Sequence, residues 1–560
     1  MFGLIFATSY SFRIFKNSKN LYHKTKYLRM NLYYLKPTIK AEPLIWQWYA
    51  WSYLIPPLTA ACNIAERHLK IMQSYVQNPQ IHAQAIKDPK LLGGPFIDLE
   101  GQKVDEVKAL LEQTKKDCQE LLALHDAFKE TDRMIQAEGR GDTLEPFYNR
   151  IPGPLKGMVE LVYDSNNHPS LRLIEPLLYR KYYNTRHQRI VLSNTVADLR
   201  KFVLSTPYLN QENEVPIEIA FSDPRIDQLF KLKRESKSLA EIQELFDISE
   251  KKQELFKSFF TTESPTLHED RNYSGDGIRI RYFGHACLLV QTKSVSLLFD
   301  PVISYPIKDS EIPRYTFEDL PDHIDYVVIT HNHQDHLMFE PLLQIRHKIG
   351  HIVFPANNRG SLEDPSLRLT LQHTGFSSLI EAKEMESIPL PDGELISLPF
   401  FGEHSDLNIQ SKLSHCVRLK GKQFLFAADS NNIEPTLYDF IFECIGSVDM
   451  LFLGMECDGA PLSWLYGPLL TTPLSRAFDK NRTLSGSNFK KAWDIVQKLQ
   501  CKKVYIYAMG QEPWLNYVMA LKYHPDSIQI TESDKLIQAC RENNIEAERL
   551  FGRKEWIIPP

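Results

Sequence analysis

The hydrophobic pattern divides the chain into two parts with different periodicities. Between residues 60 and 270, apolar residues recur at three- and four-residue spacings with charges between them. Residues 104–136 show this pattern most clearly, and residues 171–183 and 239–260 repeat it. Such spacing is typical of amphipathic helices. We therefore expect residues 30–274 to form a mainly helical domain.

The pattern changes at Gly275, where short strands become frequent. Residues 278–282 alternate with a period of two, and residues 326–330 form a compact β-branched run. Both features favour β-strands. Further short apolar runs follow at 288–291, 295–299, 352–354, 395–398, 416–419, 424–427, 450–453 and 504–507. Because a helical stretch at 488–499 and another after Pro513 lie among them, we expect residues 275–560 to form two packed sheets flanked by helices.

The first 29 residues carry six basic residues and no acidic one. Their apolar stretch, residues 2–6, is too short for a secretory signal and precedes most of the charge. Met30 offers a second start. We expect residues 1–29 to be a disordered extension or a misassigned start.

A segment without charge at residues 43–65 contains three of the seven tryptophans. Pro56 and Pro57 interrupt it, so a continuous membrane-spanning helix is not expected. We expect no stable membrane insertion. The segment is instead predicted to be buried in its domain or in a subunit interface.

Composition and charge narrow the class of protein. Hydrophobic residues make up 43% and charged residues 24%, which is ordinary for a globular protein and excludes a mostly disordered or polytopic membrane protein. A net charge of -5 gives no basic excess, so nucleic acid is not expected as a partner. The eight cysteines form no CxxC pair, which disfavours a disulfide scaffold and fits a reducing cytoplasm.

The residues that carry chemistry follow the run at 326–330. His331, His333, Asp335 and His336 lie within six positions, and a dry core would not accommodate them all. In extended backbone His331 and His333 point to the same face and can bind one ion. Asp335 and His336, on the turn after, can bind a second ion nearby.

This motif matches, residue for residue, the HxHxDH motif of the metallo-β-lactamase superfamily, which the sequence therefore resembles. The resemblance implies a four-layer αββα sandwich with a binuclear metal site at one edge. It also implies that Asp300 supports the motif loop. The turn at 284–286 resembles one of a lactonase-like branch, where His285 either orients a ligand or is a core histidine.

The remaining ligands are also read from the resemblance. The superfamily hydrolases usually have a downstream histidine and then a bridging aspartate at the end of a strand. Asp429 follows an apolar run and therefore corresponds to that aspartate. The position of the downstream histidine falls within residues 400–407. There Glu403 and His404 are adjacent, and only one is expected to face the site. His524 is the one histidine after Asp429, and whether it is a further ligand stays open.

The sequence around Glu403 resembles that of a narrower group, the diiron oxygenases that include a β-hydroxylase of chloramphenicol biosynthesis. In that group a glutamate replaces the histidine, which maps to Glu403, and the aspartate maps to Asp429. Glu403 would complete a set of three histidines and three carboxylates, and hard oxygen donors suit iron or manganese better than zinc. We favour Glu403 over His404, whose use would return the site toward zinc-type hydrolysis.

The resemblance implies a diiron monooxygenase of natural-product biosynthesis. It would use two iron ions, O2 as co-substrate and an electron donor to hydroxylate an unactivated C–H bond, with Asp335, Glu403 and Asp429 closest to the chemistry. The substrate would be an amino acid on a peptidyl carrier protein. The alternative is a hydrolase of the lactonase, esterase or phosphodiesterase type, with two zinc or manganese ions and a bridging hydroxide. A homodimer stays open.

Overall fold

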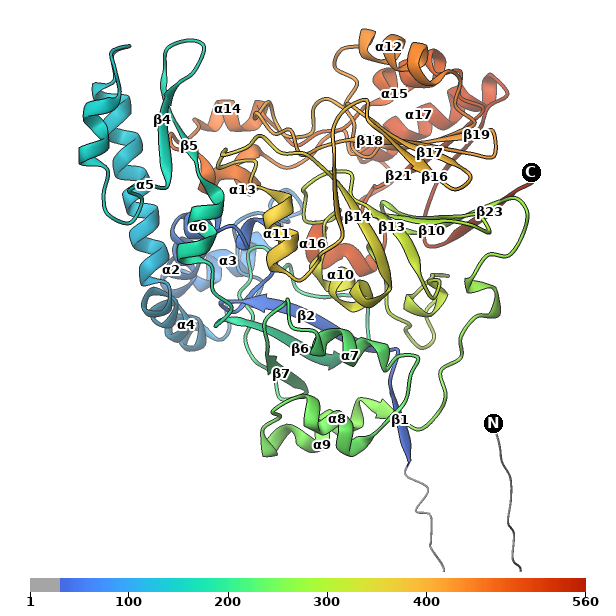
Figure 1. Cartoon of the computed structure of the whole chain (residues 1–560), viewed down its shortest axis with the longest axis horizontal. Coiled ribbons are helices and arrows are strands. Elements are labelled where there is room, and N and C mark those ends of the chain that lie inside the picture. Colours follow the sequence, from blue (N-terminus) through green and yellow to red (C-terminus); the bar gives the residue numbers. More distant parts are fainter. Residues whose placement is uncertain (1–30) are drawn as a thin grey trace, which may run out of the picture.

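A computed structural model describes residues 31–560 (Figure 1), so the predicted amino-terminal extension lies outside the described residues. The N-terminal part mixes helices and strands. Its helices are α1 (Pro57–Asn63), α2 (Leu69–Gln77), α3 (Pro79–Ala85), α4 (Val104–Asp117), α5 (Gln119–Glu138), α6 (Glu175–Tyr182), α7 (Arg225–Lys231), α8 (Leu239–Leu245) and α9 (Glu250–Ser258). Its strands are β1 (Leu32–Leu35), β2 (Ile39–Ile45), β3 (Trp48–Tyr49), β4 (Val159–Tyr163), β5 (Pro169–Leu173), β6 (Gln188–Asn194), β7 (Glu214–Glu218), β8 (Lys237–Ser238) and β9 (Phe260–Thr261).

The prediction of a mainly helical N-terminal domain is only partly confirmed. The helices predicted at 104–136 are present as α4 and α5, but β3, β2, β6 and β7 form a four-stranded sheet that was not predicted. The centre of β6 is the run Ile190, Val191 and Leu192, which is buried. This run is a strand signal in its own right, since β-branched residues fit a pleated, half-buried surface.

The second half contains two sheets, as predicted, and each sheet has seven strands. The first has the order β15-β14-β13-β12-β11-β10-β23 and the second the order β16-β17-β18-β19-β20-β21-β22. The first sheet consists of β10 (Ile278–Gly284), β11 (Cys287–Gln291), β12 (Ser296–Phe299), β13 (Ile324–Val328), β14 (Ile349–Pro355), β15 (Leu379–Ala382) and β23 (Lys554–Ile558). The second consists of β16 (Ser387–Leu390), β17 (Gly393–Leu398), β18 (Ser414–Leu419), β19 (Lys422–Phe426), β20 (Met450–Gly454), β21 (Lys503–Tyr507) and β22 (Glu546–Arg549).

Helices cover the outer faces of both sheets, which confirms the αββα sandwich. Between the sheets, Phe426 stacks on Phe299 and Phe452 with ring centroids 4.2 and 5.1 Å apart. The helices α12, α15 and α17 lie over the second sheet (Figure 1). The bounds of the helices in this half are α10 (Phe339–Ile345), α11 (Leu367–His373), α12 (Thr436–Ile445), α13 (Leu462–Tyr466), α14 (Arg476–Asn481), α15 (Phe489–Lys498), α16 (Asn516–Met519) and α17 (Ile528–Glu542).

The N-terminal part packs against the first sheet through one continuous core. Leu298 and Val327 of that sheet belong to the same buried cluster as Trp48, Trp51 and Leu58. The charge-free segment is therefore buried, as predicted. Among residues 31–560, no helix is long and apolar enough to cross a membrane.

A buried ion network joins the N-terminal part to α10, the helix that follows the HxHxDH motif. Arg200 lies 2.5 Å from Glu42 of β2 and 2.9 Å from Glu340 of α10. Tyr49 and Tyr305 each donate a hydrogen bond of 2.9 Å to Glu340. Burial opposes ionisation of Glu42, but Arg200 and Lys40 lower its pKa to about 2.

Removing the cation from this network should destabilise the protein. Arg200→Ala leaves two buried carboxylates without their shared partner, so we expect the free energy of unfolding to fall by about 3–5 kcal/mol. Denaturant unfolding followed by circular dichroism measures this loss. Arg225→Ala is the matched control, because its pair with Asp223 lies near the surface and should contribute about 1 kcal/mol or less. Equal losses in the two variants would contradict a special role for the buried network.

Candidate metal centre

The HxHxDH motif lies on the loop between β13 and α10, and Asp300 fixes that loop. The Asp300 carboxylate accepts a 2.8 Å hydrogen bond from the Thr330 amide and a 2.6 Å bond from the Thr330 hydroxyl. It also lies 2.8 Å from Nδ1 of His336. Because Asp300 holds this nitrogen, Nε2 of His336 faces the other ligand-type groups. The expected supporting role of Asp300 agrees with this geometry.

His331, His333 and Glu403 form one group that could hold a metal ion. Nδ1 of His333 lies 2.8 Å from Glu403 Oε1, and Nε2 of His331 lies 3.9 Å from Glu403 Oε2. All three side chains are buried. Two imidazoles and one carboxylate thus converge.

Asp429 lies between this group and the second half of the motif. Its Oδ2 is 3.7 Å from Nε2 of His331 and 3.0 Å from Nε2 of His336. Asp335 completes this side, with Oδ2 3.5 Å from Nε2 of His336. A carboxylate that reaches histidines of both groups has the position expected of a bridging ligand.

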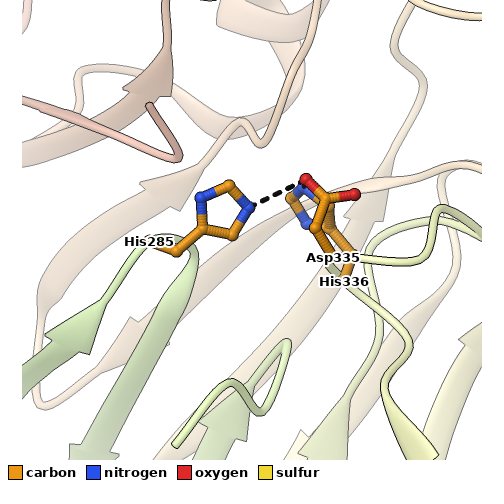
Figure 2. Close-up of side chains that lie close together, drawn as sticks. All are labelled: His285, Asp335 and His336. Carbon is orange, nitrogen blue, oxygen red and sulfur yellow. Dashed lines mark hydrogen bonds and ion pairs between the residues drawn. The ribbon is translucent and has the colours of Figure 1, made fainter. Parts of the chain in front are cut away.

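His285 forms a further possible metal group with Asp335 and His336, and Figure 2 shows its ring directed to the Asp335 carboxylate. Its Nδ1 accepts a 3.2 Å hydrogen bond from the Gly510 amide, and its Nε2 lies 3.0 Å from Asp335 Oδ2. Since Nδ1 accepts, Nε2 of the neutral ring carries the proton and donates it to Asp335. Of the two roles left open for His285, this arrangement favours orienting a ligand.

Two further histidines that the sequence offered as candidates, His404 and His524, are not among the ligand-type groups. His404 is buried, but its Nδ1 is directed to Glu403 at 3.2 Å and to the Tyr466 hydroxyl at 2.9 Å. His404 contacts the first group but belongs to none of the three ligand groups found in residues 31–560. These groups are His331, His333 and Glu403; His331, His336 and Asp429; and His285, Asp335 and His336. His524 is exposed on the loop between α16 and α17 and is absent from these groups as well.

Tyr466 is a site residue that sequence reasoning missed. Its hydroxyl lies 2.7 Å from Nε2 of His333 and is also hydrogen-bonded to His404. It therefore fixes the ring of His333 so that Nδ1 faces Glu403. Tyr466 ends α13, and nothing in its sequence neighbourhood has ligand spacing. Only folding brings it to the motif.

Several residues of the site have backbone angles in the left-handed region. The φ angles are +35° at Asp300, +51° at His285, +68° at Glu403 and +47° at Ala428, which precedes Asp429. Side chains other than glycine adopt this region at a cost, and such residues cluster at functional sites. Gly402, before Glu403, cannot be replaced easily, because an added Cβ would lie 2.4 Å from the Asn431 side chain.

Unpaired buried atoms show that this arrangement fits metal ions. Among residues 31–560, Nε2 of His331, Nε2 of His336, Oε2 of Glu403 and Oδ1 of Asp429 are buried without a hydrogen-bond partner. Buried polar atoms are normally paired. Four unpaired donor atoms facing one another, all of types that bind metals, are accounted for by cations at these positions.

The electrostatics of the site agree with cation binding. Burial and the neighbouring histidines hold the pKa of His331 well below its usual value. The neutral imidazole, which is the form that binds metals, is thereby favoured. Burial raises the pKa of Glu403, although His333 opposes it. Such a carboxyl gains from a nearby cation, because the cation favours its ionised form.

A cavity of about 390 Å³ opens onto the metal groups. His333, Asp335, Glu403 and Asp429 line its inner end. The N-terminal part contributes Phe202 and other residues to the wall. The two parts of the chain therefore share one site.

Comparisons with known proteins place this arrangement in a family. Residues 34–265 match the family described as diiron non-heme beta-hydroxylase N-terminal domain, and residues 296–460 match the beta-lactamase superfamily domain. The 4-amino-L-phenylalanyl-[CmlP-peptidyl-carrier-protein] 3-hydroxylase of Streptomyces venezuelae is 37% identical over 528 residues, covering 93% of this chain and 99% of that protein. The chain belongs to the CmlA-type diiron β-hydroxylases.

The solved structures agree with this membership. The crystal structure of CmlA, a diiron β-hydroxylase from Streptomyces venezuelae, superposes on this hydroxylase with a TM-score of 0.87 and 36% identity, covering 94% of this chain and all of that one. A metal-dependent hydrolase of Pyrobaculum arsenaticum is 40% identical over 60 residues, only 11% of this chain. Family membership confirms the predicted diiron monooxygenase over the alternative hydrolase.

Proposed function

We propose that this β-hydroxylase inserts one oxygen atom at the β-carbon of an amino acid held as a thioester on a peptidyl carrier protein. The observation that carries the proposal is the set of three histidines and three carboxylates at the inner end of the cavity, in a chain of this family. The relative from Streptomyces venezuelae is named for the 3-hydroxylation of a carrier-bound amino acid.

The ligands that we assign follow the distances. His331, His333 and Glu403 would hold one iron ion, Asp335 and His336 the other, and Asp429 would lie between them. Three oxygen donors favour iron over zinc. Tyr466 and Asp300 would orient ligands without binding metal, and His285 would donate a proton in a hydrogen bond to Asp335.

The reaction needs a partner that supplies electrons. When bound, two ferrous ions supply the reduction of O2 and the cleavage of the C–H bond. The balance is one C–H bond, O2, two electrons and two protons, giving one C–OH bond and one water, so an electron donor must restore the reduced state. His331, His336 and Asp335 are buried, so little of the metal-binding residues would be exposed to bulk water.

The experiment combines metal analysis with a single turnover. Protein purified with iron should contain about two irons per chain. After anaerobic reduction and exposure to O2, it should add one oxygen atom to an aminoacyl carrier protein, detected as a mass increase on the carrier. Two zinc ions per chain together with ester or lactone hydrolysis would contradict the proposal. The free amino acid is the control substrate, and it should react far more slowly because it lacks the docking carrier.

A further inference from the structure

The cavity contains a carboxylate that belongs to none of the three metal groups. Glu456 lies just beyond the end of β20 and lines the cavity together with Asp335, Glu403 and Asp429. Among residues 31–560, no metal-ligand group includes it. Glu456 is half-buried, and desolvation together with these three carboxylates holds its pKa well above the usual value. Glu456 therefore lines the same cavity as the metal residues without belonging to their groups.

The carboxylate of Glu456 has no partner of opposite charge. No salt bridge or hydrogen bond to this side chain is formed within residues 31–560, and His336 is the nearby group that lowers its pKa. By contrast, the buried acids Glu42 and Glu340 are paired with Arg200. A cationic ligand in the cavity would supply this partner and would favour the ionised form of the Glu456 carboxyl.

A second unpaired group lies beside it. The hydroxyl of Tyr523, on the loop between α16 and α17, is buried and has no hydrogen-bond partner among the described residues. Burial raises the pKa of Tyr523, and Glu456 is the neighbouring charge that raises it most. Tyr523 lines the same cavity. A carboxylate and a hydroxyl thus face one space, where both could accept hydrogen bonds from a cation.

Part of the remaining wall is apolar, although Lys90, Lys522 and Gln529 also line the cavity. In the apolar part, Phe202 and Leu204 come from the N-terminal part, Trp464 from α13 and Met519 from α16. Apolar side chains next to an anionic group suit a ligand with a hydrocarbon side chain and a positive group beside it. An aminoacyl thioester has this chemistry, since its α-ammonium is bonded to the carbon next to the β-carbon.

We propose that Glu456, assisted by Tyr523, binds the α-ammonium group of the aminoacyl substrate. This inference rests on the proposed function and adds a specificity to it. Because Glu456 lies near the ligand carboxylates, pairing with the ammonium group holds the adjacent β-carbon toward the metal positions. A substrate whose amine is already acylated has no ammonium group. Hydroxylation therefore precedes the condensation step that acylates this amine.

The test measures binding and needs no turnover. L-phenylalaninamide is the cationic probe, and 3-phenylpropanamide is the neutral probe of the same skeleton. Both are titrated anaerobically into the iron-loaded protein by calorimetry at about pH 6.5, where the α-amine is protonated. The wild-type protein should bind the cationic probe at least about tenfold more tightly.

Three variants test which residues cause the preference for the cationic probe. Glu456→Gln should bind both probes with nearly equal Kd, without change in the Kd of the neutral probe or in iron content. Tyr523→Phe should raise the Kd of the cationic probe a few-fold. Asp458→Asn is the control, because Asp458 lines the cavity but is exposed to solvent. It should keep the preference.

Three results would overturn the inference. They are an unchanged preference in Glu456→Gln, a loss of iron from Glu456→Gln, which would make Glu456 a metal ligand, and a wild-type protein that binds the cationic probe no better than the neutral one. In the last case, an iron content of two and oxygen insertion into the aminoacyl carrier would still stand. Failure of this inference is therefore distinguishable from failure of the proposed function.

Discussion

His331→Ala should lose most of the bound iron while the sandwich stays folded. Nε2 of His331 faces both Glu403 and Asp429, so its removal affects both metal positions. Loss of groups that only orient ligands already costs about 10–100-fold in metal affinity, and a direct ligand should cost at least as much. Iron per chain, measured by elemental analysis after desalting, should fall about tenfold or more.

A buried histidine outside the metal groups is the matched control. His415 lies in β18, is fully buried and belongs to no metal group among residues 31–560. His415→Ala should lower stability through the cavity that it leaves, yet keep its iron. If His331→Ala retained its full iron content, or if both variants lost iron equally, the assignment of His331 would be wrong.

The second large effect separates Glu403 from its neighbour His404. Glu403→Ala should lose iron from the position shared with His331 and His333, because its carboxylate is the one oxygen ligand in that group. His404→Ala should keep nearly the wild-type iron content, since His404 contacts Glu403 and Tyr466 instead. The reaction of the reduced protein with O2 should slow by about 10–100-fold or more in Glu403→Ala.

Replacing the carboxylate by an imidazole tests why it matters. Glu403→His should keep two metal ions but shift the preference toward zinc, because a histidine-rich set suits zinc better. The ratio of zinc to iron after loading from an equimolar mixture measures this shift. If His404→Ala empties the site and Glu403→Ala does not, the ligands are of the hydrolase type, and the proposed oxygenase site fails.

The central strands of the sandwich were predictable because most of them are short apolar runs that are almost fully buried. The edge strands β15, β16, β22 and β23 were not predicted, because their side chains are largely half-buried or exposed and form no apolar run. The run before Asp429 and the run before the HxHxDH motif are continuous in sequence, and their ends carry the ligands. Strands of the N-terminal sheet were missed although β6 contains a β-branched run. The segments on both sides of β6 have strong helical periodicity, and the sequence pattern therefore predicted a mainly helical domain.

What the sequence determined by itself is local. Four ligand-type side chains lie within six positions, from His331 to His336. They require a polar, metal-binding environment in any fold, because a dry core would not accept them. Which of Glu403 and His404 faces this motif was decided by tertiary structure. Gly402 and Glu403 adopt positive φ angles, and Tyr466, from a distant helix, contacts His404. Likewise, Glu456 and Tyr523 are separated along the chain, and only the packing of their loops places the carboxylate and the unpaired hydroxyl in the wall of one cavity. Sequence spacing carries no information about such contacts, since they depend on how β20, α13 and the loop after α16 meet in space.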